Sequence, residues 1–537
     1  MPTLTIRDYA GDRDIAYVPG RSLLQVLEAA RVPIRGGCDG RGGCGLCVVR
    51  ILAGDAGVPT PIECLQLDEG QLAQGQRLAC QALPQTDLRL QVLAPPPQAG
   101  WRYLDPRDRP SPRLTPAAPP DSGPALGHAP YGAAVDLGTT HLCLSLLDRR
   151  TGQWRAGCHG FNPQSAYGSD IMTRLAAAVA SPAQAHRMSQ QVVEGLGAAL
   201  WGLAIRAGIS LQHIGAVTLV GNTAMLALLS GRHCDRLLLP SQWTLAIDCQ
   251  PETTDGWVQT WGIHPRARID VIAPVAGLIG SDLLAGVLST DLTGAGGGHL
   301  LIDFGTNSEL ALWDGEVLWC TSAAGGPAFE GSGMRCGFPA EPGAIDRVEF
   351  AAGGPQMRVI GGAQPQGLCG SGVVDLIAGL VRSGQLSSRG RFAPGVPGDG
   401  FHLGCGARDL VFTGADVDLF QRAKGAIGVG ISVLLEQAGW RDRDLRRVCV
   451  GGAFGRAIDI RNAQALGLLP AIAPERIELW GNTALAGCEE ALVSPAARGR
   501  CQHLVGQCRV INLALCPDFD ERFVEHLFLR PIAGPGP

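Results

Sequence analysis

The sequence predicts a multidomain protein of mixed α/β and α+β class, with an N-terminal β-grasp domain, a proline-rich linker and a duplicated α/β core. Three observations lead to this prediction: a glycine-rich loop with three cysteines, a proline-rich stretch, and two apolar strands that each run into Asp-x-Gly-Thr. A chain of 537 residues exceeds one domain. The expected domains are residues 1–94, the linker 95–130, and the core 131–537 with lobes at about 131–295 and 296–537.

Composition and charge narrow the classes of function. The formal net charge is −5, charged residues make up 17% of the chain, and no basic stripe suggests nucleic acid as a partner. No run of about 18 apolar residues is present, so no membrane span is expected. The N-terminus lacks the features of a secretory signal, and the 18 cysteines are expected as reduced thiols in a cytoplasmic protein.

Four cysteines near the N-terminus have a spacing close to that of a plant-type 2Fe-2S cluster. Three read C-x5-C-x2-C within GGCDGRGGCGLC and a distant fourth stands in QRLACQ; the four are Cys38, Cys44, Cys47 and Cys80. The surrounding glycines let backbone N–H groups turn toward cluster sulfurs. The alternatives are structural thiols or zinc, and zinc is disfavoured because its sites usually pair two C-x2-C or C/H units. Cys64 lies outside the spacing and is left unassigned.

The residues around this loop fit a β-grasp domain. Ser22 is placed to cap a helix over residues 23–30. Short strands are expected at four places: residues 4–6, 15–18, 47–51 and 88–92.

Residues 95–130 contain APPP, PSPRLTP and APPDSGP. Such a composition cannot build a core and favours extended polyproline II. We interpret the whole segment as a tether that lets the cluster domain visit an electron donor and then its target.

The core carries three segments expected to bind a nucleotide. Asp136-Leu137-Gly138-Thr139-Thr140 and Asp303-Phe304-Gly305-Thr306-Asn307 each follow an apolar strand. Their glycines permit a tight turn whose N–H groups can face phosphate, and each Asp can hold Mg²⁺, usually through water. Two such copies suggest a duplicated domain with a nucleotide between its halves. A third segment, Gly451-Gly452-Ala453-Phe454-Gly455, is expected to lie against adenine or ribose.

These segments resemble the superfamily of acetate and sugar kinases, heat-shock cognate proteins and actin. The resemblance implies that residues 136–140 form the first phosphate loop, 303–307 the second and 451–455 the adenosine loop. Lys424, in an expected helix over 415–437, is a further candidate near the nucleotide, with a solvated helix lysine as the alternative.

The order of cluster domain, linker and ATPase core resembles the reductive activators of corrinoid proteins. The resemblance covers nearly the whole chain outside the linker. It continues through phrases without a generic explanation: Asn162-Pro163-Gln164, Tyr167-Gly168-Ser169-Asp170, Gly221-Asn222-Thr223-Ala224-Met225, Asp303-Phe304-Gly305-Thr306-Asn307-Ser308-Glu309, Gly326-Pro327-Ala328-Phe329-Glu330-Gly331, Gly367-Leu368-Cys369-Gly370-Ser371-Gly372 and Gly481-Asn482-Thr483.

This resemblance implies ATP-dependent transfer of one electron from the 2Fe-2S cluster to the inactive Co(II) form of a corrinoid methyltransferase protein, which restores Co(I). The expected partners are that corrinoid protein and a low-potential electron donor, and a homodimer is left open. A plant-type cluster lies near about −400 mV, and a gap of about 150 mV to the cobalt would cost roughly 3.5 kcal/mol. Differential binding of the partner's two states is of a size to offset this cost.

Carboxylates are the candidate catalytic groups. Asp136 and Asp303 are expected to organise Mg²⁺ and phosphate. Asp170, Glu309 and Glu330 are candidates to orient the attacking water, and a structural hydrogen-bonding carboxylate is the alternative for each.

Competing interpretations remain open at this point. The protein is alternatively a redox-regulated small-molecule kinase, or a nucleotide-gated scaffold without turnover. An activator of acyl-CoA dehydratases is disfavoured because such activators hold a cluster between subunits. The late cysteines lack a tight C-x2-C grouping, so no second cluster is expected from Cys488, Cys501, Cys508 and Cys516.

Overall fold

The computed structural model describes residues 2–8, 11–30, 32, 34, 47–93, 101–104, 129–168, 170–294, 296–325, 327–330, 333–351, 354–404, 410–452 and 456–532. The chain forms two compact units, and each is described by itself. The first comprises Met1–Arg102, Thr139–Leu142 and His159–Ala198, and the second comprises Tyr103–Gly138, Cys143–Cys158 and Ala199–Pro537.

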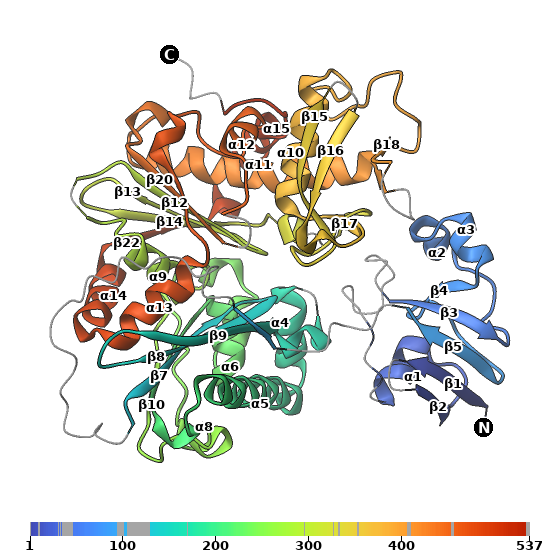
Figure 1. The fold of residues 1–537 in the computed structure, drawn as a ribbon, viewed down its shortest axis with the longest axis horizontal. Helices are drawn as coiled ribbons and strands as arrows, with labels where there is room; N and C mark the ends of the chain where they lie inside the picture. Colours follow the sequence, from blue (N-terminus) through green and yellow to red (C-terminus); the bar gives the residue numbers. More distant parts are fainter. Residues whose placement is uncertain are drawn as a thin grey trace. The chain divides into compact units, whose positions relative to one another are not determined.

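A five-stranded sheet of order β2-β1-β5-β3-β4 forms the N-terminal domain, drawn in blue in Figure 1. Its strands are β1 (Thr3–Asp8), β2 (Gly11–Ala16), β3 (Val48–Ala53), β4 (Gln76–Leu78) and β5 (Leu88–Val92). Helix α1 (Leu23–Ala29) shares a buried core with this sheet, in which Leu4, Leu27 and Leu90 are fully buried. The expected β-grasp arrangement is confirmed. The second strand ends at Ala16 rather than at residue 18, because Ala16 pairs with Thr3, the first residue of β1.

Two short helices between β3 and β4 were not expected from the sequence. They are α2 (Pro61–Gln66) and α3 (Glu69–Ala73). Each begins with a capping box, Thr60 with Glu63 and Asp68 with Gln71. Reciprocal caps of this kind hold helices that are too short to persist alone.

The first lobe of the core is built on a six-stranded sheet of order β11-β10-β7-β8-β9-β6. Its strands are β6 (Arg102–Tyr103), β7 (Tyr131–Leu137), β8 (His141–Asp148), β9 (Trp154–Phe161), β10 (Ile214–Gly221) and β11 (Arg268–Val271). The strand β6 lies inside the range expected to be a tether, so that interpretation is wrong for residues 102–103.

The second lobe repeats this order, with a sheet β21-β20-β12-β13-β14-β22. Its strands are β12 (His299–Phe304), β13 (Ser308–Trp313), β14 (Leu318–Ala323), β20 (Arg447–Gly452), β21 (Ile477–Leu479) and β22 (Cys508–Ile511). In each lobe, the strand that ends in a phosphate loop has a parallel neighbour, β10 beside β7 and β20 beside β12. The duplicated architecture expected from the two Asp-x-Gly-Thr copies is therefore confirmed.

Smaller strands and the helices complete the core. The strands are β15 (Ala344–Ala351), β16 (Gly354–Val359), β17 (Gly367–Leu368), β18 (Phe401–His402) and β19 (Val411–Phe412). The helices are α4 (Ile171–Ala180), α5 (Pro182–Ala207), α6 (Thr223–Ser230), α7 (Cys234–Leu237), α8 (Asp255–Trp261), α9 (Ser281–Ser289), α10 (Gly370–Arg382), α11 (Gly414–Gln437), α12 (Ile460–Ala465), α13 (Thr483–Val493), α14 (Pro495–Gln507) and α15 (Phe519–His526). Among the residues described, no helix has the length and apolar character needed to cross a bilayer.

Helices α9 and α13 lie side by side between the two large sheets (Figure 1). Helix α9 contacts β10, β12 and β13, whereas α13 contacts β7 and β10. Their crossing is close because Gly487 of α13 faces the backbone carbonyl of Ala285 in α9. This pair of helices thus joins the strands that carry both phosphate loops.

We predict that Gly487→Ala destabilises the core by about 1–3 kcal/mol or more, since a methyl group there would overlap backbone rather than a movable side chain. The control is Gly499→Ala in α14, where a Cβ meets nothing within 4 Å. That change should be neutral or stabilise by up to about 1 kcal/mol. Chemical denaturation of both variants measures the difference, and equal stabilities would contradict the close crossing.

Candidate functional site

Two of the predicted cluster ligands lie at one end of a strand pair. Cys47 directly precedes β3, Cys80 follows β4, and Val48 pairs with Leu78. The Ala79 N–H donates to the Cys47 carbonyl at 2.8 Å. Both cysteines are buried, at 2% and 9% exposure. The other two predicted ligands, Cys38 and Cys44, lie outside the described residues.

The surroundings of Cys80 fit an iron–sulfur ligand. The Gln81 side-chain amide donates to the Cys80 sulfur at 3.6 Å. Donors aimed at ligand sulfurs are a means by which proteins tune such clusters. The backbone N–H of Leu24, at the start of α1, donates to the Ala79 carbonyl at 2.8 Å and holds this segment in place. Cys64, by contrast, is exposed on α2.

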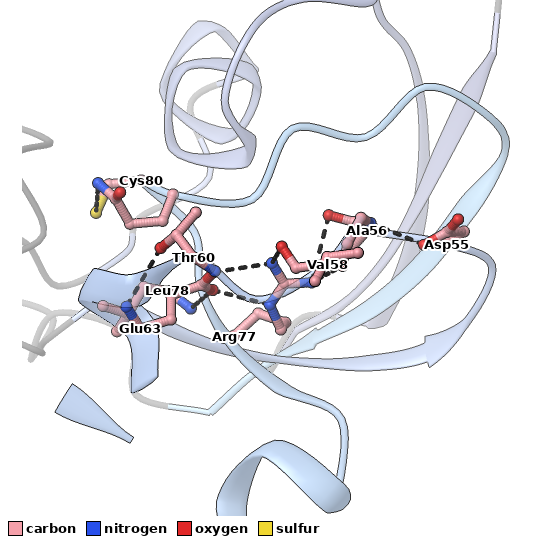
Figure 2. A network of polar contacts seen from close by, with 10 residues as sticks. Asp55, Ala56, Val58, Thr60, Glu63, Arg77, Leu78 and Cys80 are labelled. Atoms are coloured by element: carbon pink, nitrogen blue, oxygen red, sulfur yellow. Dashed lines mark hydrogen bonds and ion pairs between the residues drawn. The ribbon is translucent and has the colours of Figure 1, made fainter. Parts of the chain in front are cut away.

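A buried ion pair supports the strand that leads to Cys80 (Figure 2). The Glu63 carboxylate accepts hydrogen bonds from Arg77 Nε, Arg77 Nη2 and the Thr60 N–H, each at 2.8 Å, and from the Leu78 N–H at 2.9 Å. Burial alone would raise the pKa of Glu63, but these hydrogen bonds outweigh it and hold the pKa below its usual value. The Arg77 guanidinium also donates to the Gly57 carbonyl at 2.6 Å. The pair thus ties α2 and the preceding loop to β4.

Four carboxylates gather in the core around the two phosphate loops. Asp136 is in β7, Asp303 in β12, Glu309 in β13 and Asp282 in α9. Asp303 and Glu309 are cross-strand partners in the β12–β13 pair. All four keep part of their surface exposed, so a ligand can reach them.

The N-terminus of α13 connects the two loops. Asn482 caps this helix, its Oδ1 accepting from the Leu485 N–H at 2.6 Å, and its Nδ2 donates to Asp136 at 2.6 Å. The next residue, Thr483, donates from its hydroxyl to Asp303 at 2.8 Å. One turn of helix therefore holds the aspartate of each half of the duplicated core.

Burial and mutual repulsion perturb these acids. Burial, with a contribution from Asp303, raises the pKa of Asp136 to about 7, although Asn482 opposes the shift. Burial and the charge of Asp136 raise the pKa of Asp282 to about 7. Burial, followed by the charges of Asp282 and Asp303, raises the pKa of Glu309 well above its ordinary value. A divalent cation relieves such repulsion, so this arrangement is chemically suited to Mg²⁺.

The donor set also indicates how Mg²⁺ would be held. Within the described part of the chain, no three His, Cys, Asp or Glu side chains converge closely enough to hold a metal ion by themselves. Mg²⁺ commonly keeps several waters and uses one or two carboxylates together with nucleotide phosphates. The carboxylates therefore fit a hydrated Mg²⁺–nucleotide and not an all-protein metal site.

The predicted adenosine loop begins beside the second phosphate loop. Gly451 pairs with Asp303 in the parallel β12–β20 pair, and a Cβ at Gly451 would lie 2.9 Å from the Thr483 hydroxyl oxygen. Gly452 has a φ of +89° and faces the Phe304 carbonyl, which excludes a side chain. Glycine is thus required at both positions, because the backbone lies close to Thr483 at Gly451 and to Phe304 at Gly452. Gly455 lies outside the described residues.

The predicted phosphate loops occupy the turns expected from the sequence. Gly305, Thr306 and Asn307 join β12 to β13, and Gly138, Thr139 and Thr140 join β7 to β8. The first loop is supported from below by Arg174, which is 1% exposed and donates to the Thr139 and Gly168 carbonyls, each at 2.7 Å. Burial lowers the pKa of Arg174 to about 10, against the opposing charge of Asp170.

The other predicted site residues, Asp170, Lys424 and Glu330, are not among the four clustered carboxylates. Asp170 caps α4, with both oxygens accepting hydrogen bonds from Thr173 at 2.9 and 2.7 Å. Lys424 is 1% exposed and donates to the carbonyls of His526 and Phe528 at 2.5 and 2.6 Å, so it is not the solvated lysine considered as the alternative. The Glu330 side chain lies outside the described residues. Roles for these three residues at a nucleotide stay predictions.

The late cysteines are dispersed over separate elements. Cys488 donates to the Thr218 carbonyl at 3.2 Å from within α13. Cys501 is buried in α14, Cys508 begins β22, and Cys516 is half-buried. Burial raises the pKa of Cys501 to about 11, as expected for a structural thiol.

Sequence reasoning gave no site role to three groups: Asp282, Arg174, and the side chains of Asn482 and Thr483, although Gly481-Asn482-Thr483 is among the segments that carry the family resemblance. Only the last had a signal, because Gly-Asn-Thr occurs twice, at residues 221–223 and 481–483. Both copies follow a sheet strand and start a helix with Asn as the cap. A repeated capping motif is therefore the feature that points to Asn482.

Comparisons with known proteins agree with this arrangement. Residues 8–85 match the 2Fe-2S iron-sulfur cluster binding domain, residues 131–295 the RACo middle region, and residues 298–533 the C-terminal domain of RACo, the ASKHA domain. The corrinoid activation enzyme RamQ of Eubacterium limosum is 31% identical over 415 residues, which cover 73% of this chain and 69% of RamQ.

Two further relatives extend the match. A Co(II) methylated amine-specific corrinoid protein reductase of Methanosarcina barkeri is 26% identical over 395 residues, covering 68% of this chain and 70% of the relative. A solved structure of a reductive activator for corrinoid,iron-sulfur protein is 25% identical, with a TM-score of 0.66 and coverage of 99% of both chains.

The fold and its two sites define an iron–sulfur protein joined to a core of the ASKHA class. Within that class, the chain belongs to the family of reductive activators of corrinoid proteins.

We predict that Glu63→Gln destabilises the N-terminal domain by about 3–5 kcal/mol, because it leaves the buried Arg77 charge uncompensated. Calorimetry of the full chain and iron retention against a chelator measure the effect. The control is Glu69→Gln on the exposed first turn of α3, which should change neither. A Glu63→Gln protein with the parent's melting temperature would show that the pair does not support β4.

The carboxylate cluster should destabilise the metal-free protein at alkaline pH. The Asp282 pKa is about 7 in the folded state and about 3.9 in an unfolded chain. Between these values the folded form holds a proton that the unfolded form has lost, so the free energy of unfolding falls as the pH rises from about 4 to about 7. We expect Asp282→Asn to raise Tm by about 2–4 °C at pH 8 and by much less at pH 5.

The matched control for this pH dependence is Asp248→Asn, which removes an exposed carboxylate paired with Arg232. Its effect should be small and similar at both pH values. An equal Tm shift for Asp282→Asn at pH 5 and pH 8 would contradict the repulsion among the four acids.

Proposed function

We propose that this protein uses ATP to transfer one electron from a 2Fe-2S cluster to the inactive Co(II) form of a corrinoid methyltransferase protein, restoring Co(I). The observation that carries the proposal is the presence of two separate chemical sites in one chain. One is a pair of buried cysteines at a strand end, and the other is a set of carboxylates tied together by Asn482 and Thr483. Family membership supplies the class of substrate.

The first site delivers electrons. Cys38, Cys44, Cys47 and Cys80 hold the cluster, which supplies one electron at low potential when it is bound. The Gln81 amide stabilises negative charge on the Cys80 sulfur, because it donates a hydrogen bond to that atom. With the cluster bound, a low-potential donor would recharge this site, and the electron that leaves it would convert Co(II) to Co(I) in the corrinoid substrate.

The second site binds and hydrolyses the nucleotide. Asp136 and Asp303 orient hydrated Mg²⁺, and Asn482 and Thr483 fix their side chains. Among the three acids first considered for the attacking water, Glu309 is the one that lies in the carboxylate cluster, as the cross-strand partner of Asp303. We assign it that role, with Asp282 beside it.

Nucleotide turnover makes the uphill electron transfer possible in this proposal. The core binds the Co(II) partner more tightly in one nucleotide state, which offsets the cost of reduction, and hydrolysis resets the complex. The helix pair α9 and α13 is placed to transmit the change, because α13 bonds the aspartates of both phosphate loops.

The test separates the two sites within the same chain. Asp303→Asn should keep about two irons per chain but lose partner-stimulated ATP hydrolysis by about 10²–10³-fold, as for loss of a key electrostatic group. Cys80→Ser should lose iron but retain ATP hydrolysis. Both variants should fail to form Co(I) when the Co(II) corrinoid protein, Mg·ATP and a low-potential reductant are supplied without oxygen.

The control Asp248→Asn changes an exposed aspartate in the same core and should keep both activities. Full ATP hydrolysis by Asp303→Asn would move the nucleotide site elsewhere. Phosphorylation of a small metabolite without a corrinoid partner would favour the kinase alternative, and absence of any hydrolysis would favour the scaffold.

A further inference from the structure

Residues 101–104 stand between two proline-rich stretches and are bound to the first lobe. The Leu104 N–H donates to the Gly157 carbonyl of β9 at 2.9 Å, and β6 is the outermost strand of that sheet. Trp101, Tyr103 and Leu104 are each half-buried, whereas Arg102 is exposed. From Trp101 to Tyr103 the side chains alternate between half-buried and exposed, as in an edge strand packed on its neighbour.

Three glycines of the first lobe face this segment. A Cβ at Gly157 would lie 2.9 Å from Leu104 Cδ1, and a Cβ at Gly160 would lie 2.8 Å from the Trp101 ring. A Cβ at Gly202 would overlap the Tyr103 hydroxyl, although glycine inside helix α5 is otherwise unfavourable by about 1 kcal/mol. The surface is thus shaped for these three side chains.

A cation–π contact adds to the packing. The Arg206 guanidinium, in the last turn of α5, lies 3.7 Å from the centroid of the Tyr103 ring. Burial, with the charges of His159 and Arg102, lowers the pKa of His141 to about 4, and His141 directly follows Thr140.

We propose that residues 101–104 are a fixed anchor, so that only residues 94–100 lie along the chain between the cluster domain and its first attachment to the first lobe. Residues 105–128 are then flanked on both sides by residues bound to the first lobe. At its far end Ala129 is 1% exposed, and the Pro130 carbonyl accepts from the Arg149 N–H at 2.9 Å. The anchor goes beyond the proposed function, and only its consequence for electron delivery rests on that function.

The anchor shortens the reach of the cluster domain. From Leu93 to Trp101 there are eight Cα–Cα steps, which span at most about 26–29 Å. A tether running to Tyr131 would have 38 steps and could span about 125–137 Å. By the −3/2 power of length, the shorter tether raises the effective concentration of the cluster domain about tenfold. In the proposed function, the corrinoid partner therefore binds no farther from β6 than this span and the width of the cluster domain allow.

The experiment places the same 20-residue Gly/Ser insert after Gln98 or after Pro116 in the full holoprotein. The first insert lengthens the tether by up to about 66 Å and should increase the maximum dimension seen by small-angle X-ray scattering. The second lengthens only the loop and should leave the spread of the two domains unchanged. An equal increase for both inserts would overturn the anchor.

A second measurement tests the anchor without insertion. Trp101→Ala/Tyr103→Ala should speed hydrogen exchange of the Leu104 amide by about tenfold or more, because its bond to Gly157 is no longer held. The control Arg102→Ala alters the exposed residue of the same strand and should leave this exchange slow. Unchanged exchange in the double variant would overturn the anchor.

The same proteins test the consequence for electron delivery. With the Co(II) corrinoid protein and Mg·ATP, the insert after Gln98 should slow Co(I) formation about sixfold by the −3/2 power, and the insert after Pro116 should not. If the parent forms no Co(I), the proposed function fails while the scattering and exchange results still decide the anchor. Equal rates for both inserts in an active parent would overturn the short-reach consequence.

Discussion

The burial and mutual repulsion of four half-buried carboxylates are the constraint around which the core is organised. Asp136, Asp282, Asp303 and Glu309 come from four different elements, and burial raises the pKa of each. Apolar packing does not compensate for placing four acids together, so other contacts in the fold must hold their side chains in place. It does so through α13, whose first turn bonds two of the acids, and through the close α9–α13 crossing beneath them. A site of this kind is destabilising until a cation and phosphate arrive, which suits a protein that responds to nucleotide.

The N-terminal domain has the opposite requirement, a stable and rigid site rather than one destabilised until its ligand binds. The proposed function requires its cluster ligands to stay fixed while the domain passes an electron from a donor to the corrinoid partner. The buried pair of Glu63 and Arg77 is fully compensated by hydrogen bonds and ties a helix, a loop and a strand together next to Cys80. The proposed anchor at residues 101–104 would limit how far this domain travels. In that proposal, a rigid ligand site and a short connection together keep the electron close to the core.

Much of the fold was predictable because the sequence signals for it lie within short segments. The cysteine spacing and the two Asp-x-Gly-Thr segments each lie within a few residues, and they led to the β-grasp domain and to the duplicated core. The pairing of Asp136 with Asn482 was not predictable, because the two residues are 346 positions apart. Asp282 had no motif around it, and its importance comes from the acids that the fold brings near it.

The interpretation of residues 95–130 as one tether is wrong for residues 102–103 for a similar reason. Proline content indicates what a segment cannot build by itself, but it says nothing about a surface elsewhere that receives it. Here the surface that receives the segment is formed by Gly157 and Gly160 in a strand and Gly202 in a helix. Nothing in the sequence around these glycines indicates that they contact residues 101–104. Lys424 shows the same limit, since its two carbonyl acceptors lie about a hundred residues downstream, around the end of α15.

The most direct test of the whole account is an anaerobic spin count in one reaction. The reduced holoprotein is mixed with one equivalent of Co(II) corrinoid protein, with no other reductant, and the electron paramagnetic resonance signals of the reduced cluster and of Co(II) are followed with and without Mg·ATP. The account predicts that both signals disappear in equal amounts and only when Mg·ATP is present. Consumption of ATP with an undiminished Co(II) signal, or equal loss of both signals without nucleotide, would contradict it.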